Sequence, residues 1–101
     1  MPIYETATYQ VKPEAVDDVR AAIETFVRYV TEHEPATRMY TAWQEADDPT
    51  RFLHLFIFDN EEARQIHSTS DAVAAFEAAY GPNLVDGPVV FTGFDQVATN
   101  T

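Results

Sequence analysis

The apolar positions between Glu14 and Glu34 repeat with the period of an α-helix. They fall at i, i+3, i+7, i+10, i+11 and i+14, a series that lies along one helical face. Its members are Val16, Val19, Ile23, Phe26, Val27 and Val30. Pro13 suits the first turn of such a helix and Pro35 cannot continue it, so the pattern predicts one long amphipathic helix.

Two shorter helices are predicted in the second half of the chain. Asn60 can cap a helix over Glu61–His67, whose first turn carries two acidic residues. Ser70 or Asp71 caps the next helix, in which three apolar residues share a face and which a Gly-Pro pair ends. Those three residues are Val73, Phe76 and Tyr80.

Four segments are rich in β-branched and aromatic residues and are predicted to be strands. They are Ile3–Val11, Thr37–Glu45, Arg51–Asp59 and Val89–Val97. The segment 46–50 joins two of them as a hairpin turn, and Asn83–Pro88 is a further turn by composition. The order β-α-β-β-α-β is typical of a ferredoxin-like α+β fold, a four-stranded antiparallel sheet with helices on one face. We expect residues 1–101 to form a single domain with a frayed tail at 97–101.

The third predicted strand does not alternate apolar with polar residues. Phe52, Phe56 and Phe58 point to one face, and Leu53, Leu55 and Ile57 point to the other. In the fourth strand, Val89 and Phe91 likewise lie opposite Val90 and Phe94. Helices cover only one face, and each large apolar side chain left in water forgoes ~1.5–3 kcal/mol of burial. The pattern therefore predicts a homodimer with sheets packed face to face rather than a monomer capped by its short, polar tail.

The chain is strongly acidic, with 17 acidic and six basic residues and a formal net charge of −11. Such a field repels nucleic acid phosphates and anionic membranes, so we expect neither as a partner. No apolar run approaches the ~20 residues of a membrane helix, and no signal peptide is evident, so a cytoplasmic location is expected. The absence of cysteine excludes disulfides, thiolate metal sites and a thiol nucleophile.

Two histidines are candidates for catalysis. His67 lies near the end of its predicted helix, where it either acts as a general base or caps the last carbonyls. His54 lies among apolar residues of the third strand, as a hydrogen-bonded core group or, if it lines a cavity beside His67, as a second base or an orienting donor. Their spacing matches no helical metal motif, so no metal site is expected, and His33 at a solvated helix end is only a dipole partner.

Aromatic residues are predicted to wall a pocket for a flat ligand, although each could equally belong to an ordinary core. They are Tyr9, Tyr40, Trp43, Phe56, Phe76 and Phe91. Arg38 and Arg64 are the basic residues best placed to hold an oxyanion, with surface ion pairs as the alternative.

The segment from Phe58-Asp59 through Glu61-Glu62-Ala63, His67, Ser70 and Phe76, with Gly87-Pro88-Val89 later, resembles the antibiotic biosynthesis monooxygenase family. The resemblance extends from Tyr4 to Val97 and implies a dimeric α+β barrel. Members of this family include cofactor-free oxygenases of quinols or polycyclic phenols, heme-degrading enzymes and many proteins without known activity. Many relatives have Trp in place of Phe58, Glu in place of Phe56 and a second His in place of Ala72. No Asn occurs in Ile3–Val11, which disfavours heme degradation.

Two functions are open at this point. The first is a cofactor-independent monooxygenase that uses molecular oxygen on a quinol or another small phenolic substrate, with His67 as the leading base. The alternative is a non-catalytic or stress-associated dimeric barrel that binds a small apolar molecule. The retained His67 and the polar His54 favour the enzyme, whereas the missing second His and Glu favour the binding protein. An isomerase on the same scaffold is a third hypothesis that the sequence does not test.

Overall fold

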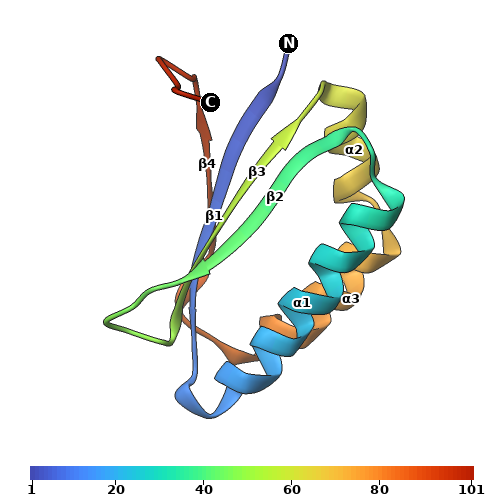
Figure 1. Cartoon of the computed structure of the whole chain (residues 1–101). Coiled ribbons are helices and arrows are strands. Elements are labelled where there is room, and N and C mark those ends of the chain that lie inside the picture. The colour runs from blue at the N-terminus through green and yellow to red at the C-terminus, as the bar shows by residue number, and fades with distance from the viewer.

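The computed structural model describes all residues, 1–101, and forms one sheet with helices on one side (Figure 1). Its elements are β1 Ile3–Val11, a 3₁₀ turn Pro13–Ala15, α1 Val16–His33, β2 Thr37–Gln44, β3 Arg51–Phe58, α2 Glu61–Ser68, α3 Asp71–Tyr80, a 3₁₀ turn Gly81–Asn83 and β4 Leu84–Phe94. The strands are antiparallel in the order β2-β3-β1-β4. The predicted ferredoxin-like α+β fold is confirmed.

The helices begin where their capping residues place them. The Asn60 side chain accepts a hydrogen bond from the backbone N–H of Ala63 at 2.9 Å and starts α2. Ser70, rather than Asp71, caps α3 by accepting from the N–H of Val73 at 3.1 Å. These caps satisfy backbone donors that a helix leaves free in its first turn. None of the helices is both long and apolar enough to cross a membrane.

The last strand differs from the prediction at both ends, because β4 runs from Leu84 to Phe94 rather than from Val89 to Val97. The expected turn at Asn83–Pro88 is instead mostly strand with an irregularity, where the pairing with β1 shifts register. Asp86 and Gly87 take positive φ angles of 59° and 99° there. A bulge of this kind lets an edge strand contain Gly and Pro, since an edge strand needs fewer backbone donors than a central one.

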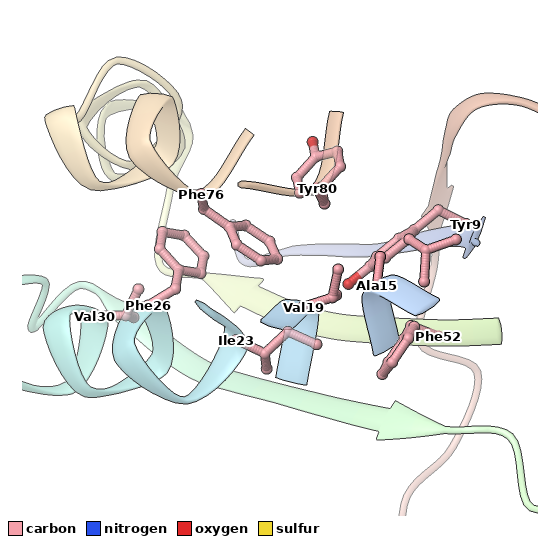
Figure 2. Close-up of a cluster of buried hydrophobic side chains, with 10 residues drawn as sticks. Tyr9, Ala15, Val19, Ile23, Phe26, Val30, Phe52, Phe76 and Tyr80 are labelled. Carbon is pink, nitrogen blue, oxygen red and sulfur yellow. The ribbon is translucent and has the colours of Figure 1, made fainter. Parts of the chain in front are cut away.

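The core lies between the sheet and the helices. Figure 2 shows Phe26 from α1 facing Phe76 from α3, with Tyr80, Tyr9 and Phe52 farther along the same layer. The rings of Phe26 and Phe76 stack with centroids 5.0 Å apart. This aromatic layer holds α1 and α3 above the sheet, and α2 lies beyond it along the same face (Figure 1).

The opposite face of the sheet, here the outer face, carries apolar side chains that nothing in the chain covers. Its apolar members are Met39, Trp43, Leu53, Leu55, Ile57, Val90 and Phe94. Trp43 and Val90 are each 56% exposed, and Phe94 is 54% exposed. The two-faced pattern predicted for β3 is confirmed, because Phe52, His54, Phe56 and Phe58 are buried while the residues between them are only half-buried.

Candidate functional site

A cavity of about 320 Å³ opens between the sheet and the helices. Its wall is mainly aromatic and draws on all four strands and all three helices. The residues predicted for a site that line it are Tyr9, Tyr40, His54, Phe56, His67, Phe76 and Phe91. Its volume lies at the lower end of the ~300–1,000 Å³ range of small-molecule sites. The fold thus brings both candidate histidines to one cavity.

Trp43 does not line this cavity, which corrects the prediction that it shares a pocket with Tyr40. Successive side chains of a strand point to opposite faces, and positions 40 and 43 of β2 differ by an odd number. Tyr40 therefore faces the helices, and Trp43 lies on the outer face beside a separate hollow with Leu53 and Val90. Phe91 does line the cavity, but it is 62% exposed, so it lies at the opening.

His67 is held by a buried carboxylate. It sits in the last turn of α2, where its Nδ1 lies 2.8 Å from Oε1 of Glu34. His67 is 9% exposed and Glu34 5% exposed. A carboxylate only accepts hydrogen bonds, so Nδ1 carries the ring hydrogen and donates it. Nε2 has no hydrogen-bond partner in the chain, and its lone pair is left free in a residue that lines the cavity.

Aromatic rings fix the orientation of His67 on its other sides. The ring centroids of Phe26, Tyr40, Phe56 and Phe58 lie between 5.2 and 6.0 Å from that of His67. Thr37 donates its hydroxyl to the same Glu34 oxygen at 2.9 Å and so holds the carboxylate in turn. A histidine with one nitrogen bound to a carboxylate and the other free is the arrangement that orients a general base.

Sequence reasoning missed Glu34. It follows α1 in the run Glu32-His33-Glu34-Pro35, whose charged residues predict a solvated helix end. Glu34 nevertheless lies four residues after the buried Val30 and so continues the apolar stripe of α1. Pro35 ends the helix, because a residue before proline is disfavoured in the helical region. The sequence signal for a buried carboxylate was therefore an acidic residue at the position where the apolar stripe of α1 would continue.

His54 is nearly fully buried and both of its ring nitrogens are engaged. Nε2 lies 2.8 Å from the hydroxyl of Tyr9, and Nδ1 lies 2.8 Å from the hydroxyl of Tyr40. Burial lowers the pKa of the His54 imidazole from 6.5 to about 4, so the ring is neutral at neutral pH. His54 is therefore a buried, hydrogen-bonded side chain, which is one of the roles that the sequence left open. Both ring nitrogens thus have tyrosine partners, and neither is free to take a substrate proton.

The tyrosines around His54 keep their hydroxyl hydrogens. Burial, followed by the charges of neighbouring groups, raises the pKa of Tyr9 and of Tyr40 well above the usual range. The same main cause raises the pKa of Tyr80, which stacks on Tyr9, to about 12. At neutral pH these hydroxyls are therefore both donors and acceptors.

The folded protein is expected to lose stability as the pH falls from about 6.5 towards about 4, because of His54. Its pKa is about 4 when folded and ~6.5 when unfolded, so the unfolded chain takes up the proton first as the pH is lowered. The stability that the neutral His54 ring contributes is fully present above the pKa of the unfolded chain. It is lost as the pH falls to the pKa of the folded protein. At 1.36 kcal/mol per pKa unit it contributes roughly 3 kcal/mol.

Urea unfolding of the wild type and of His54→Leu across this pH range measures the effect. The difference between the two proteins removes the contribution of carboxylates that both contain. A His54 ring that gains its proton near the ordinary histidine pKa, followed by NMR, would contradict the expectation.

The two candidate arginines form ion pairs. Arg38 contacts Asp59 at 3.0 Å and does not line the cavity. Arg64 lines the cavity and contacts Glu5 at 3.1 Å and Glu61 at 3.3 Å. Two carboxylates thus already neutralise Arg64. Both arginines form ion pairs, which was the alternative to their holding an oxyanion. No three His, Asp or Glu side chains gather in an arrangement that could hold a metal ion.

Comparison with known proteins identifies the family and the fold. The antibiotic biosynthesis monooxygenase family model matches residues 2–79. The comparison with curated proteins gives no match. A Caulobacter crescentus protein named for the same family is 23% identical, with a TM-score of 0.86 over 96% of this chain and 91% of its own.

Two further solved structures share the fold at similarly low identity. A Methanosarcina mazei protein is 22% identical, with a TM-score of 0.83 over 93% of this chain and 91% of its own. A Mycobacterium tuberculosis protein is 21% identical, with a TM-score of 0.85 over all of both chains. The structural matches show the fold, and the family match covers more than half of the sequence. The chain belongs to the antibiotic biosynthesis monooxygenase family.

Proposed function

We propose that the protein is a cofactor-independent monooxygenase that oxidises a quinol or another small phenol with molecular oxygen. The observation that carries this proposal is His67, whose Nδ1 is held by Glu34 and whose Nε2 is free in the wall of an aromatic cavity. Membership of the family supports monooxygenase chemistry. The quinol or phenol is inferred from what a neutral imidazole and flat aromatic walls can bind and activate.

In this proposal His67 Nε2 takes the proton of a phenolic hydroxyl. The resulting phenolate is electron-rich and reduces oxygen directly, and the new carbon–oxygen bond forms a ring hydroperoxide. Loss of water from the hydroperoxide leaves a carbonyl, so a quinol and oxygen give a hydroxyquinone and water. One oxygen atom enters the product and the other leaves in water. The protein supplies the base and the aromatic walls, and His67 returns its proton to the peroxide oxygen, which gives the hydroperoxide before water is lost.

Oxygen uptake with a panel of reduced quinols and phenols tests the proposal. Loss of a general base costs ~10²–10⁴-fold, so His67→Ala is expected to lower enzyme-dependent uptake by at least ~100-fold. His33→Ala is the matched control, because His33 is exposed at the end of α1, away from the cavity. Uptake no faster than autoxidation of every compound in the panel would contradict the enzymatic proposal.

A non-catalytic or stress-associated barrel that binds a small apolar molecule is the second candidate. The hydrogen bonds of His54 favour it, because they leave His67 as the one histidine in the cavity with a free nitrogen. Compounds that raise the melting temperature without enzyme-dependent oxygen uptake would support this second candidate over the first.

We also propose that two copies of the chain pair through the outer face. Each exposed apolar side chain there forgoes ~1.5–3 kcal/mol of burial in a monomer. Packing against a second sheet would bury Trp43, Val90 and Phe94, which are each more than half exposed.

The mass in solution is expected to be near twice 11.4 kDa. Leu55→Glu should give monomers by placing a charge at the centre of the outer face, whereas Thr25→Glu on the exposed side of α1 should not. Sedimentation equilibrium measures both variants. A wild-type monomer at micromolar concentration would contradict the proposed pairing.

A further inference from the structure

Three polar side chains form a hydrogen-bonded chain across three neighbouring strands. His54 in β3 pairs with Ala7 of β1 on one side and with Ala42 of β2 on the other. Tyr9 and Tyr40 each lie two residues from those partners, on the same face of the sheet as His54. Their hydroxyls meet the two ring nitrogens of His54 at 2.8 Å each. All three residues line the cavity.

One hydrogen-bond donor of the Tyr9–His54–Tyr40 chain has no acceptor within the protein. A neutral imidazole has one nitrogen that donates and one that accepts. One tyrosine therefore gives its hydrogen to His54, and the other tyrosine receives the ring N–H at its oxygen. The receiving tyrosine keeps its own hydroxyl hydrogen, and neither hydroxyl has a hydrogen bond other than that to His54. Buried donors are satisfied in most folded proteins, so this hydrogen calls for an acceptor.

We propose that the Tyr9–His54–Tyr40 chain is a ligand-binding donor, in which the tyrosine that accepts from His54 gives its hydroxyl hydrogen to a ring carbonyl of an aromatic ligand. The free hydrogen lies on Tyr40 when Nδ1 of His54 carries the ring hydrogen, and on Tyr9 when Nε2 carries it. A bound carbonyl beside one of the two tyrosines therefore selects one tautomer of His54. Tyr9 and Tyr40 touch the ligand in this assignment, and His54 is a positioning residue.

The ligand class follows from two of the polar features of the cavity taken together. His67 Nε2 offers a lone pair, and the Tyr9–His54–Tyr40 chain offers one hydrogen. A flat molecule that carries a ring hydroxyl and a ring carbonyl, such as a hydroxyquinone, satisfies both. The choice of this class rests on the proposed function, whereas the free donor rests only on the hydrogen bonds of His54.

Binding of naphthoquinone and of naphthalene tests the donor without turnover. The two probes have the same ring system, but only naphthoquinone carries acceptors, and it has no hydrogen for the His67 lone pair. The chain has no cysteine for a quinone to alkylate. A net hydrogen bond of ~0.5–1.5 kcal/mol corresponds to roughly 2–12-fold, so wild type should bind naphthoquinone more tightly by about that factor. The preference should vanish in Tyr9→Phe/Tyr40→Phe.

The nitrogen NMR signals of His54 supply a second readout, on the wild-type protein alone. Saturation with naphthoquinone should shift the ring towards one tautomer, and naphthalene should leave the tautomer populations unchanged. Equal affinity for the two probes together with unchanged tautomers would overturn the proposal, as would a naphthoquinone preference that survives in a folded Tyr9→Phe/Tyr40→Phe variant.

The His67→Ala variant separates this inference from the proposed function. It should keep both the naphthoquinone preference and the tautomer shift even though it loses oxygen uptake. A protein with the tautomer shift and without any oxygen uptake would uphold the donor and refute the oxygenase. The reverse result, uptake that depends on His67 without any response of His54, would refute the donor alone.

Discussion

Replacing Glu34 by glutamine is expected to lower the kcat of the proposed quinol oxidation by at least ~100-fold, as general-base loss does. Glu34 accepts the Nδ1 hydrogen of His67 and thereby leaves the Nε2 lone pair for the substrate. A glutamine side chain can instead donate to Nδ1, which moves the ring hydrogen to Nε2 and removes the base from the cavity. The cavity walls are unchanged, so KM should change little.

The matched control for this prediction is Glu32→Gln, because Glu32 is an exposed acidic residue in the last turn of α1. It should retain the wild-type kcat. Glu34→Gln/His67→Ala should be no slower than His67→Ala alone, since residues that act as one unit have non-additive effects. A Glu34→Gln enzyme with wild-type kcat would show that the carboxylate does not set the state of His67.

Replacing His54 by leucine is expected to have the largest effect on stability, a loss of about 2–6 kcal/mol. The substitution removes the hydrogen-bond partner of both Tyr9 and Tyr40 at once. A buried polar group left without a partner costs ~1–3 kcal/mol, and here there are two such groups. Whole domains have only ~5–15 kcal/mol of stability, so this one change can consume much of it.

The control for His54→Leu also removes the hydroxyls of Tyr9 and Tyr40. Replacing both partners of a hydrogen bond by apolar groups can be nearly neutral, so Tyr9→Phe/His54→Leu/Tyr40→Phe should be more stable than His54→Leu alone. Urea unfolding at neutral pH and one protein concentration measures both variants, because pairing of copies would make stability depend on concentration. If the triple variant is less stable than His54→Leu, the stability lost in His54→Leu comes from lost packing and not from the two unpaired hydroxyls.

The architecture was predictable where a single segment determines its own structure. The stripe of α1 and the Asn60 cap depend on spacings of three or four residues, and both appear as expected. The start of β4 was not predictable, because Gly87 and Pro88 signal a turn locally. Only the pairing of β4 with β1 turns that signal into a bulge in an edge strand.

The candidate site was predictable by residue type but not by role. The alternation of β2 alone places Tyr40 and Trp43 on opposite faces of the sheet, because their positions differ by an odd number. The partners of the histidines could not be read from the sequence, because they join distant segments. Glu34 and His67 are 33 residues apart, and Tyr9 and His54 are 45 apart. Their hydrogen bonds depend on how α1 and α2 pack over the sheet and on the register of its strands.

Product labelling with isotopic oxygen gas tests the central claim, that this protein inserts oxygen with His67 as its base. The best quinol from the uptake panel is oxidised under labelled oxygen, and the product is weighed by mass spectrometry. A sample of labelled product held in ordinary water for the same time corrects for exchange. The account predicts one labelled atom in each product molecule from the wild type and only the autoxidation background from His67→Ala. Unlabelled product, or equal labelling by both proteins, would contradict it.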